Sequence, residues 1–402
     1  MTPAARAGYG LDALNLLVAG SQTGFGAFVA VYLTSQAWTQ AHIGEALSLG
    51  AIVAMLSQLP AGALVDRARS KRVVVGVGAG AVALSALLFL WPTPLAVIAA
   101  KMLHGFASCL IGPGIAALSL ALAGKAAFGE RLGRNAQFSS VGSAGAALVL
   151  GWIGTYISGG AVFTVTAALM LGGLLTLTLL PPGAPARLAA GVDRSESYRQ
   201  MLSDRRLLGF AGCVALFQLA NAAMLPLVAG ELTRVAGLSA NLVIAACIVA
   251  PQVVVALLSP MVGRLADRFG RRPLLVLGFA ALPLRGVLLA AGAFYPAMVI
   301  PVQVLDGISA AALGVLLPLV AADLTGKRGG FNRRLAVLGL AGGAGATLST
   351  AIAGRIAQEF GISTALLALA GAGAVAVGGV LLLGETNPRA GGPPNARSWR
   401  PA

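Results

Sequence analysis

The chain has 402 residues, of which 57% are hydrophobic and 10% are charged. Because soluble domains carry about a quarter charged residues, this composition excludes a soluble protein built on one globular core. The formal net charge of +15 does not indicate a nucleic-acid partner, because the Lys and Arg residues lie between apolar stretches and not on a basic, aromatic-rich surface.

Apolar stretches of about twenty residues recur from Leu11 to Leu383, and each is long enough for a helix to cross a hydrocarbon core of ~30 Å. We therefore predict an all-α membrane protein with twelve transmembrane helices. The predicted ranges are 11–36, 43–65, 73–91, 95–123, 136–158, 161–181, 207–232, 240–262, 273–294, 297–322, 333–357 and 362–383.

These helices fall into two groups. Residues 1–181 and 207–384 are expected to form two six-helix bundles, joined by a polar and basic cytoplasmic loop at 182–206. Residues 385–402 are expected to be a disordered cytoplasmic tail. Of the 28 Lys and Arg residues, 24 fall near the termini or in every second connection, so the positive-inside rule assigns both termini to the cytoplasm. We expect a multi-pass protein of a bacterial inner membrane.

An internal repeat relates the two groups of helices. Segment 62–67 reads GALVDR and recurs at 263–268 as GRLADR, an offset of 201 residues. Segment 97–105 recurs at 299–307 with an offset of 202 residues. Because six predicted crossings separate the copies, both halves have the same topology, related by a pseudo-two-fold axis along the membrane normal. A binding site is then expected between the halves.

The first repeated segment begins a longer motif. Residues 263–272 read GRLADRFGRR, and in the first half Gly62, Leu64, Asp66, Arg67 and Lys71 match the same pattern, whereas Arg69 replaces its second glycine and can alter the turn. The motif resembles the Gly-x-Leu-Ala-Asp-Arg-x-Gly-Arg-Arg signature of the major facilitator superfamily. This resemblance implies a fold of two six-helix bundles related by a parallel repeat, and a bacterial, twelve-helix transporter similar to the drug:proton antiporters.

The motif predicts a gate that holds the cytoplasmic side shut. Its Asp can accept hydrogen bonds from the exposed amides of a neighbouring helix start, and its Arg residues can pair with acids at adjacent helix ends. Asp323 is the expected partner of Arg268 or Arg271, and Glu130 is a weaker candidate in the first half. The alternative is that these charges only anchor the loops in water. The expected gate residues are Gly62, Asp66, Arg67, Gly263, Asp267, Arg268, Gly270, Arg271 and Asp323.

Four ionisable residues lie at membrane depth, where charge is costly and usually functional: Lys101, His104, Arg285 and Asp306. Arg285 and Asp306 each lie nine residues from the outer end of adjacent predicted helices, ~13 Å deep at 1.5 Å per residue, so we predict an ion pair. The pair can be static, or Asp306 can exchange between Arg285 and a proton or cationic substrate.

Lys101 and His104 are three residues apart and share a helix face. The resemblance implies that His104 and Asp306, which are repeat mates, lie on opposite walls of a central cavity, and that Lys101 takes the place of an Arg found in many proton-coupled exporters. Lys and His can both exchange protons where Arg cannot. Alternatively, His104 only forms a hydrogen bond in helix packing.

Uncharged polar residues on the presumed lining helices are candidates for binding substrate, although hydrogen bonding between helices is the alternative. They are Asn15, Gln22, Gln218, Asn221 and Gln303. One signature is missing: residues 142–154 lack the proline-containing, glycine-rich pattern that marks helix 5 in many superfamily antiporters. Its absence weakens the inference that the transporter is an exporter.

We therefore expect a monomeric secondary transporter in the lipid bilayer that moves a small organic solute by alternating access, with proton-coupled efflux as the leading hypothesis. Uptake of an organic anion, metabolite or siderophore is the alternative, and a non-transporting receptor or scaffold is a further one. The basic excess expected in the cavity, from Lys101 and Arg285 against Asp306, favours an anionic or zwitterionic solute. No enzymatic activity, cofactor or metal is expected, because no nucleotide-binding glycine loop and no His, Cys and carboxylate cluster is apparent.

Overall fold

The computed structural model describes residues 3–25, 27–38, 40–124, 126–181, 198–228, 240–291, 296–325 and 329–386, and every regular element in these ranges is helical. The elements of the first half are α1 (Pro3–Gly24), α2 (Ala27–Ser35), α3 (Gln40–Arg67), α4 (Lys71–Leu88), α5 (Pro94–Ala123), α6 (Phe128–Tyr156), α7 (Gly159–Thr176) and the 3₁₀ turn η1 (Leu177–Leu179). Those that follow are α8 (Tyr198–Met201), α9 (Arg205–Asn221), α11 (Ala240–Phe269), α12 (Arg272–Ala291), α13 (Pro296–Thr325), α14 (Phe331–Phe360) and α15 (Ile362–Leu382).

Polar caps mark the starts of several helices. The side chains of Ser70, Thr93 and Ser158 each accept a hydrogen bond from the backbone amide three residues on, at the starts of α4, α5 and α7. Asp204 does the same for two amides at the start of α9. Short polar side chains at these positions accept hydrogen bonds from amides that have no partner within the helix. Each of these helices therefore begins directly after its capping residue.

Eleven helices in the described ranges are long and apolar enough to cross a membrane. The predicted crossing at 11–36 is not among them, because it is divided between α1 and the nine-residue α2, and α1 carries Asp12, Asn15 and Gln22. The predicted start of the fifth crossing is wrong: α6 begins at Phe128, eight residues before position 136. This difference matters for the site, because it places two arginines inside a helix.

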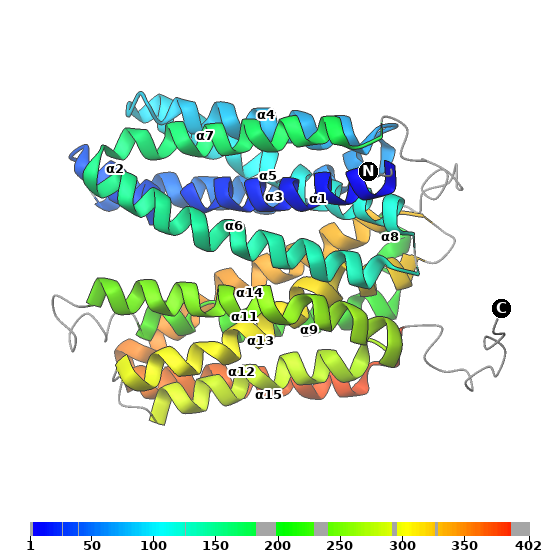
Figure 1. Cartoon of the computed structure of the whole chain (residues 1–402). Helices are drawn as coiled ribbons and strands as arrows, with labels where there is room; N and C mark the ends of the chain where they lie inside the picture. Colours follow the sequence, from blue (N-terminus) through cyan, green and yellow to red (C-terminus); the bar gives the residue numbers. More distant parts are fainter. Residues whose placement is uncertain are drawn as a thin grey trace.

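The helices form two bundles that lie side by side (Figure 1), one containing α1 to α7 and the other α9 to α15. One hydrophobic cluster draws all its buried residues from the first half, between Ala7 and Leu180. The largest cluster belongs mainly to the second half, but it also includes Ala116, Phe128 and Leu132. The hydrophobic core therefore continues from one half to the other where α5 and α6 meet the second bundle.

Part of the predicted central loop is ordered against both bundles. Residues 182–197 lie outside the described ranges, but the short helix α8 follows them, and the Tyr198 hydroxyl donates to the carbonyl of Leu59 in α3. The ring of Tyr198 lies 5.7 Å from the guanidinium carbon of Arg333 in α14, and Met201 is buried. Burial raises the pKa of Tyr198, so the phenol remains a donor at neutral pH. The segment thus connects α3 to α14 at the end of the molecule where the chain starts (Figure 1).

Candidate functional site

A cavity of about 680 Å³ lies between the two halves. Its walls come from α1, α5 and α6 in the first half and from α13 and α14 in the second. The polar lining residues all belong to the first half: Asn15, Gln22, Thr23, Ser108, Asn135, Ser139 and Ser143. The second half contributes Gly314, Pro318 and Leu335. All the polar groups of the lining therefore lie on the first-half wall, where they alternate with apolar residues such as Val18, Ile111 and Ile115, and the second-half wall is entirely apolar.

Two of the five residues predicted to bind substrate line this cavity, namely Asn15 and Gln22. Gln218 is half-buried, and its Cγ lies 3.4 Å from the position a Cβ would take at Gly342 in α14. Asn221 and Gln303 bind an arginine instead, as described next. The structure thus places two of the five in the cavity lining, two in a second polar cluster, and Gln218 against α14.

The second cluster surrounds Arg285 in α12, which is 1% exposed. Its Nη1 donates to Asp306 Oδ1 at 2.7 Å and to Asn221 Oδ1 at 2.7 Å, and its Nη2 donates to Gln303 Oε1 at 2.9 Å. The predicted contact between Arg285 and Asp306 is therefore present. Of the three acceptors, only Asp306 is ionisable, and its side chain is 20% exposed. Asn221 is the last residue of α9, so the cluster joins α9, α12 and α13.

Lys101 and His104 lie on α5 beside the cavity, but neither is among its lining residues. His104 Nε2 lies 2.7 Å from Gln22 Oε1, and its ring stacks on Phe25 with a centroid distance of 3.8 Å. Lys101 is buried, and its side chain packs against Gly50 of α3. Within the described ranges it has no carboxylate partner. His104 therefore reaches the cavity only through Gln22.

The first gate contact joins the end of α3 to the start of α14. Asp66 Oδ1 accepts from the Asn332 backbone amide at 3.1 Å and from Asn332 Nδ2 at 2.7 Å, and Oδ2 accepts from the Arg333 amide at 3.0 Å. Gly62 allows the approach, because a Cβ there would lie 2.7 Å from the Asn332 carbonyl oxygen. We call this set of contacts, between Asp66, Gly62 and the first turn of α14, the first latch.

The second latch is its repeat mate, between the end of α11 and the start of α6. Both carboxylate oxygens of Asp267 lie 2.6 Å from the position that a Cβ would occupy at Gly129. Gly263 packs directly on the Gly129 carbonyl, and Gly133 packs on the Ser259 carbonyl, so the two backbones touch where side chains would not fit. Each latch therefore holds a helix start of one half against a helix end of the other.

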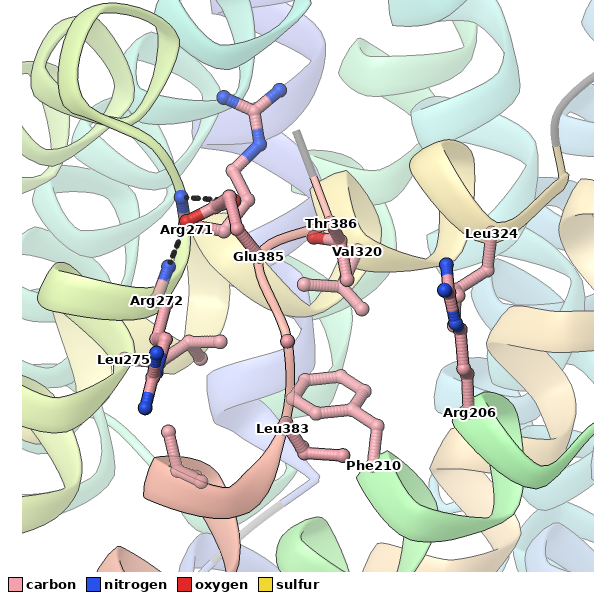
Figure 2. Close-up of a pocket in the computed structure, with 12 residues that line it drawn as sticks. Arg206, Phe210, Arg271, Arg272, Leu275, Val320, Leu324, Leu383, Glu385 and Thr386 are labelled. Atoms are coloured by element: carbon pink, nitrogen blue, oxygen red, sulfur yellow. Dashed lines mark hydrogen bonds between the residues drawn. The ribbon is translucent and has the colours of Figure 1, made fainter. Parts of the chain in front are cut away.

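Further charged residues support the second latch, and Figure 2 shows two of them, Arg271 and Glu385. Arg271 donates to Asp267 and Asp323, both at 3.1 Å, so Asp323 pairs with Arg271 and not with Arg268, whose guanidinium lies over the Phe269 ring. The two carboxylate oxygens of Glu385 accept from the backbone amides of Arg271 and Arg272 at 2.9 and 3.0 Å. Residues at the start of the predicted tail thus fix the first turn of α12.

The two latches differ at the turn that follows. Gly270 has a φ of 98°, a conformation that favours glycine. No residue from Ala68 to Ser70 has a positive φ, in accordance with Arg69 at the glycine position. In that turn Lys71 Nζ donates to the carbonyls of Asp66 and Ala68 at 3.0 Å. The exposed Arg67 forms no ion pair within the described ranges, and neither does the exposed Glu130, which lies beside Gly263 at the second latch.

Sequence reasoning missed three buried charges in the described ranges, namely Arg333 and Arg334 at the start of α14 and Asp12 in α1. Asp12 is 3% exposed. Its carboxylate pairs with Arg131 and Arg134 of α6. Arg131 Nε also donates to Asn135 Oδ1 at 2.8 Å, which connects the cluster to the cavity wall. The spacing of Arg131, Arg134 and Asn135 indicated one helix face, but the predicted start of α6 at position 136 left them in a loop.

Comparisons with known proteins agree with this architecture. The family model described as Major Facilitator Superfamily matches residues 11–254 and 210–402. Two uncharacterized MFS-type transporters of Mycobacterium tuberculosis, from strains CDC 1551 and H37Rv, are 37% identical over 386 residues, which cover 92% of this chain and 91% of theirs. Among solved structures, the proton:xylose symporter XylE has a TM-score of 0.74 at 13% identity, covering 96% of both chains. The E. coli fucose:proton symporter FucP has a TM-score of 0.75 at 16% identity, covering 94% of this chain and 98% of FucP.

Proposed function

Because this chain belongs to the major facilitator superfamily, we propose that it is a secondary active transporter that moves a small organic solute across a bacterial inner membrane by alternating access. In this mechanism the two halves move about a central site, which opens to one side of the membrane at a time. The cavity between the halves is the proposed site. Both latches close the end of the molecule that the charge pattern assigns to the cytoplasm.

The latches suit a reversible gate. The first holds the Asp66 carboxylate against the amides of a helix start, and such contacts contribute roughly 0.3–1 kcal/mol each at exposed sites. The second holds the Asp267 carboxylate beside Gly129 at the start of α6. Water can replace these hydrogen bonds when the halves separate. The bundle interface is therefore stable enough to hold one state and weak enough to release it.

We propose that protons drive the cycle at Asp306, and one observation carries this proposal. Arg285 has three acceptors, of which two are neutral amide oxygens from Asn221 and Gln303. When Asp306 takes up a proton, Arg285 keeps both neutral partners, so its buried charge is not left without hydrogen bonds. Asp306 is the ionisable acceptor of the cluster, its side chain is 20% exposed, and only its Oδ1 is engaged by Arg285. Protonation would loosen the contact between α12 and α13.

The direction we propose is efflux, in exchange for protons. Uptake is the second candidate, because α6 lacks the proline-containing signature typical of superfamily antiporters. We also propose His104 as a proton acceptor, because its hydrogen bond to the lining residue Gln22 places a titratable ring directly behind the cavity wall.

Proteoliposomes with an imposed pH gradient test the proposal. Solute flux through the wild-type protein should follow the gradient, and Asp306→Asn should abolish this dependence while it retains exchange of solute across the membrane. Asp204→Asn is the matched control, because Asp204 caps α9 and Asn caps helices equally well. A solute flux that does not depend on the pH gradient would refute proton coupling. The sign of the gradient that accumulates solute decides between efflux and uptake, and no flux of any solute would favour a receptor or scaffold.

A further inference from the structure

The lining of the central cavity carries information about the solute. None of its eighteen lining residues in the described part of the chain is charged. Lys101, Arg285 and Asp306 lie outside this set, so they do not give the cavity the basic character expected from the sequence. Arg131 donates to the lining residue Asn135, but its guanidinium is also bound to Asp12 and to the Gly8 carbonyl.

The hydroxyl groups of the lining residues already donate their protons to other groups of the protein. Thr23 Oγ1 donates to the Ala19 carbonyl at 3.0 Å, and Ser143 Oγ donates to the same carbonyl at 3.4 Å. Ser139 Oγ donates to Asn15 Oδ1 at 3.4 Å. A hydroxyl has one proton and two lone pairs, so each of these groups keeps acceptor capacity after its proton is used.

The amide groups of the lining are partly engaged as well. Asn15 Nδ2 donates to the Leu11 carbonyl at 2.7 Å, Gln22 Nε2 to Ser108 Oγ at 3.1 Å, and Asn135 Nδ2 to Ser119 Oγ at 2.7 Å. Each amide nitrogen has two protons, so one donor remains on each. The polar wall therefore presents more acceptors than donors and no charge.

This pattern discriminates between classes of solute. A carboxylate or phosphate offers only acceptors, and its charge would be buried without a cation. An ammonium group would lack a carboxylate in the lining. A hydroxyl both donates and accepts, so several hydroxyls can use the abundant acceptors and the few remaining amide donors. The apolar wall of Gly314, Pro318 and Leu335 then faces the C–H side of such a molecule.

We propose that the cavity binds an uncharged, polyhydroxylated solute, such as a polyol or a sugar-like molecule, and that the first half holds its hydroxyl edge. The cavity volume of about 680 Å³ lies in the range of roughly 300–1,000 Å³ for small-molecule sites. The inference rests on the proposed function, since it assigns the substrate class of that same cavity.

A charge-matched series tests the substrate class. Reconstituted full-length protein is offered neutral pentoses, hexoses and hexitols, and for each hexose the corresponding uronic acid and amino sugar, together with simple organic anions, cations and drug-like compounds. Flux of a neutral member at least about tenfold above its uronate and its amino sugar supports the proposal. Preference for the uronate, the amino sugar or another ion overturns it. If no compound moves but a neutral member raises the melting temperature, the transport function fails and the binding inference stands.

A variant pair locates the binding to this wall. Thr23→Val removes a lining hydroxyl without a change in shape, and Thr164→Val is its control, because Thr164 makes the same bond to the carbonyl four residues back on the exposed face of α7. We expect Thr23→Val to raise KM about tenfold with kcat little changed, and Thr164→Val to match the wild type. Equal KM values for the two variants would refute the assignment. If Thr23→Val is unstable in detergent, Ser143→Ala makes the same test.

Discussion

Removal of the Asp66 carboxylate should open the end of the molecule that carries both latches, which we propose to face the cytoplasm. Asp66 accepts three hydrogen bonds from the first turn of α14, at 2.7, 3.0 and 3.1 Å. Loss of such a cap costs about 0.5–2 kcal/mol, and loss of the charge beside the helix dipole costs about 0.3–1 kcal/mol more. We expect Asp66→Ala to shift the equilibrium by roughly 1–3 kcal/mol toward the open state, which is about 5- to 150-fold in the ratio of open to closed molecules.

The accessibility of the cavity from the cytoplasmic side measures this shift. Ser139 lines the cavity, so Ser139→Cys is introduced into a chain whose native Cys109, Cys213 and Cys247 are replaced by Ala, and a membrane-impermeant thiol reagent is added to inverted vesicles. The labelling rate should rise with Asp66→Ala and stay unchanged with Asp204→Ala, which removes a helix cap within one half. A labelling rate that is unchanged or lower with Asp66→Ala would refute the latch.

Three further predictions follow from other contacts. Gly133→Val should prevent α6 from approaching Ser259 of α11, so the Ser139→Cys label should react rapidly from the cytoplasmic side, and slow labelling would contradict this. Arg285→Met should lower stability by about 3–5 kcal/mol, because it strands a partly buried carboxylate; melting temperatures should show partial rescue by Asp306→Asn, and no rescue would argue against the pair. Glu385→Gln should cost only about 0.3–1 kcal/mol and loosen the first turn of α12, which faster amide hydrogen exchange there would reveal and unchanged exchange would contradict.

Much of the fold was predictable, because a bilayer imposes length and apolarity on each crossing helix. The contact of Arg285 with Asp306 was predictable for the same reason, since equal depth on adjacent antiparallel helices leaves few other partners. The contact of Asp66 with α14 required more: the motif indicated a helix start, but only the structure identifies which one.

The lining of the cavity was less predictable, because periodicity gives the face of a helix and not the neighbour that this face meets. Asn221 and Gln303 share the chemistry of Asn15 and Gln22, yet the buried guanidinium of Arg285 binds both of them. The partners of Asp12, Arg131 and Arg134, were hidden by an error of eight residues at the start of α6. A polar helix start such as 128–135 lowers hydropathy, so composition shortens the helix although the backbone continues through it.

The single helix α6 carries residues of the second latch, of the Asp12 cluster and of the cavity lining. Gly129 meets the second latch, Arg131 meets Asp12, and Asn135 to Ser143 line the cavity. No proline interrupts α6, so Gly129 and Ser143 are the ends of one stiff rod of about 21 Å, at 1.5 Å per residue. A solute that tilts this rod at the cavity must also displace its tip at the latch. Occupancy can then be signalled to the gate by leverage within a single helix, without a relay of side chains.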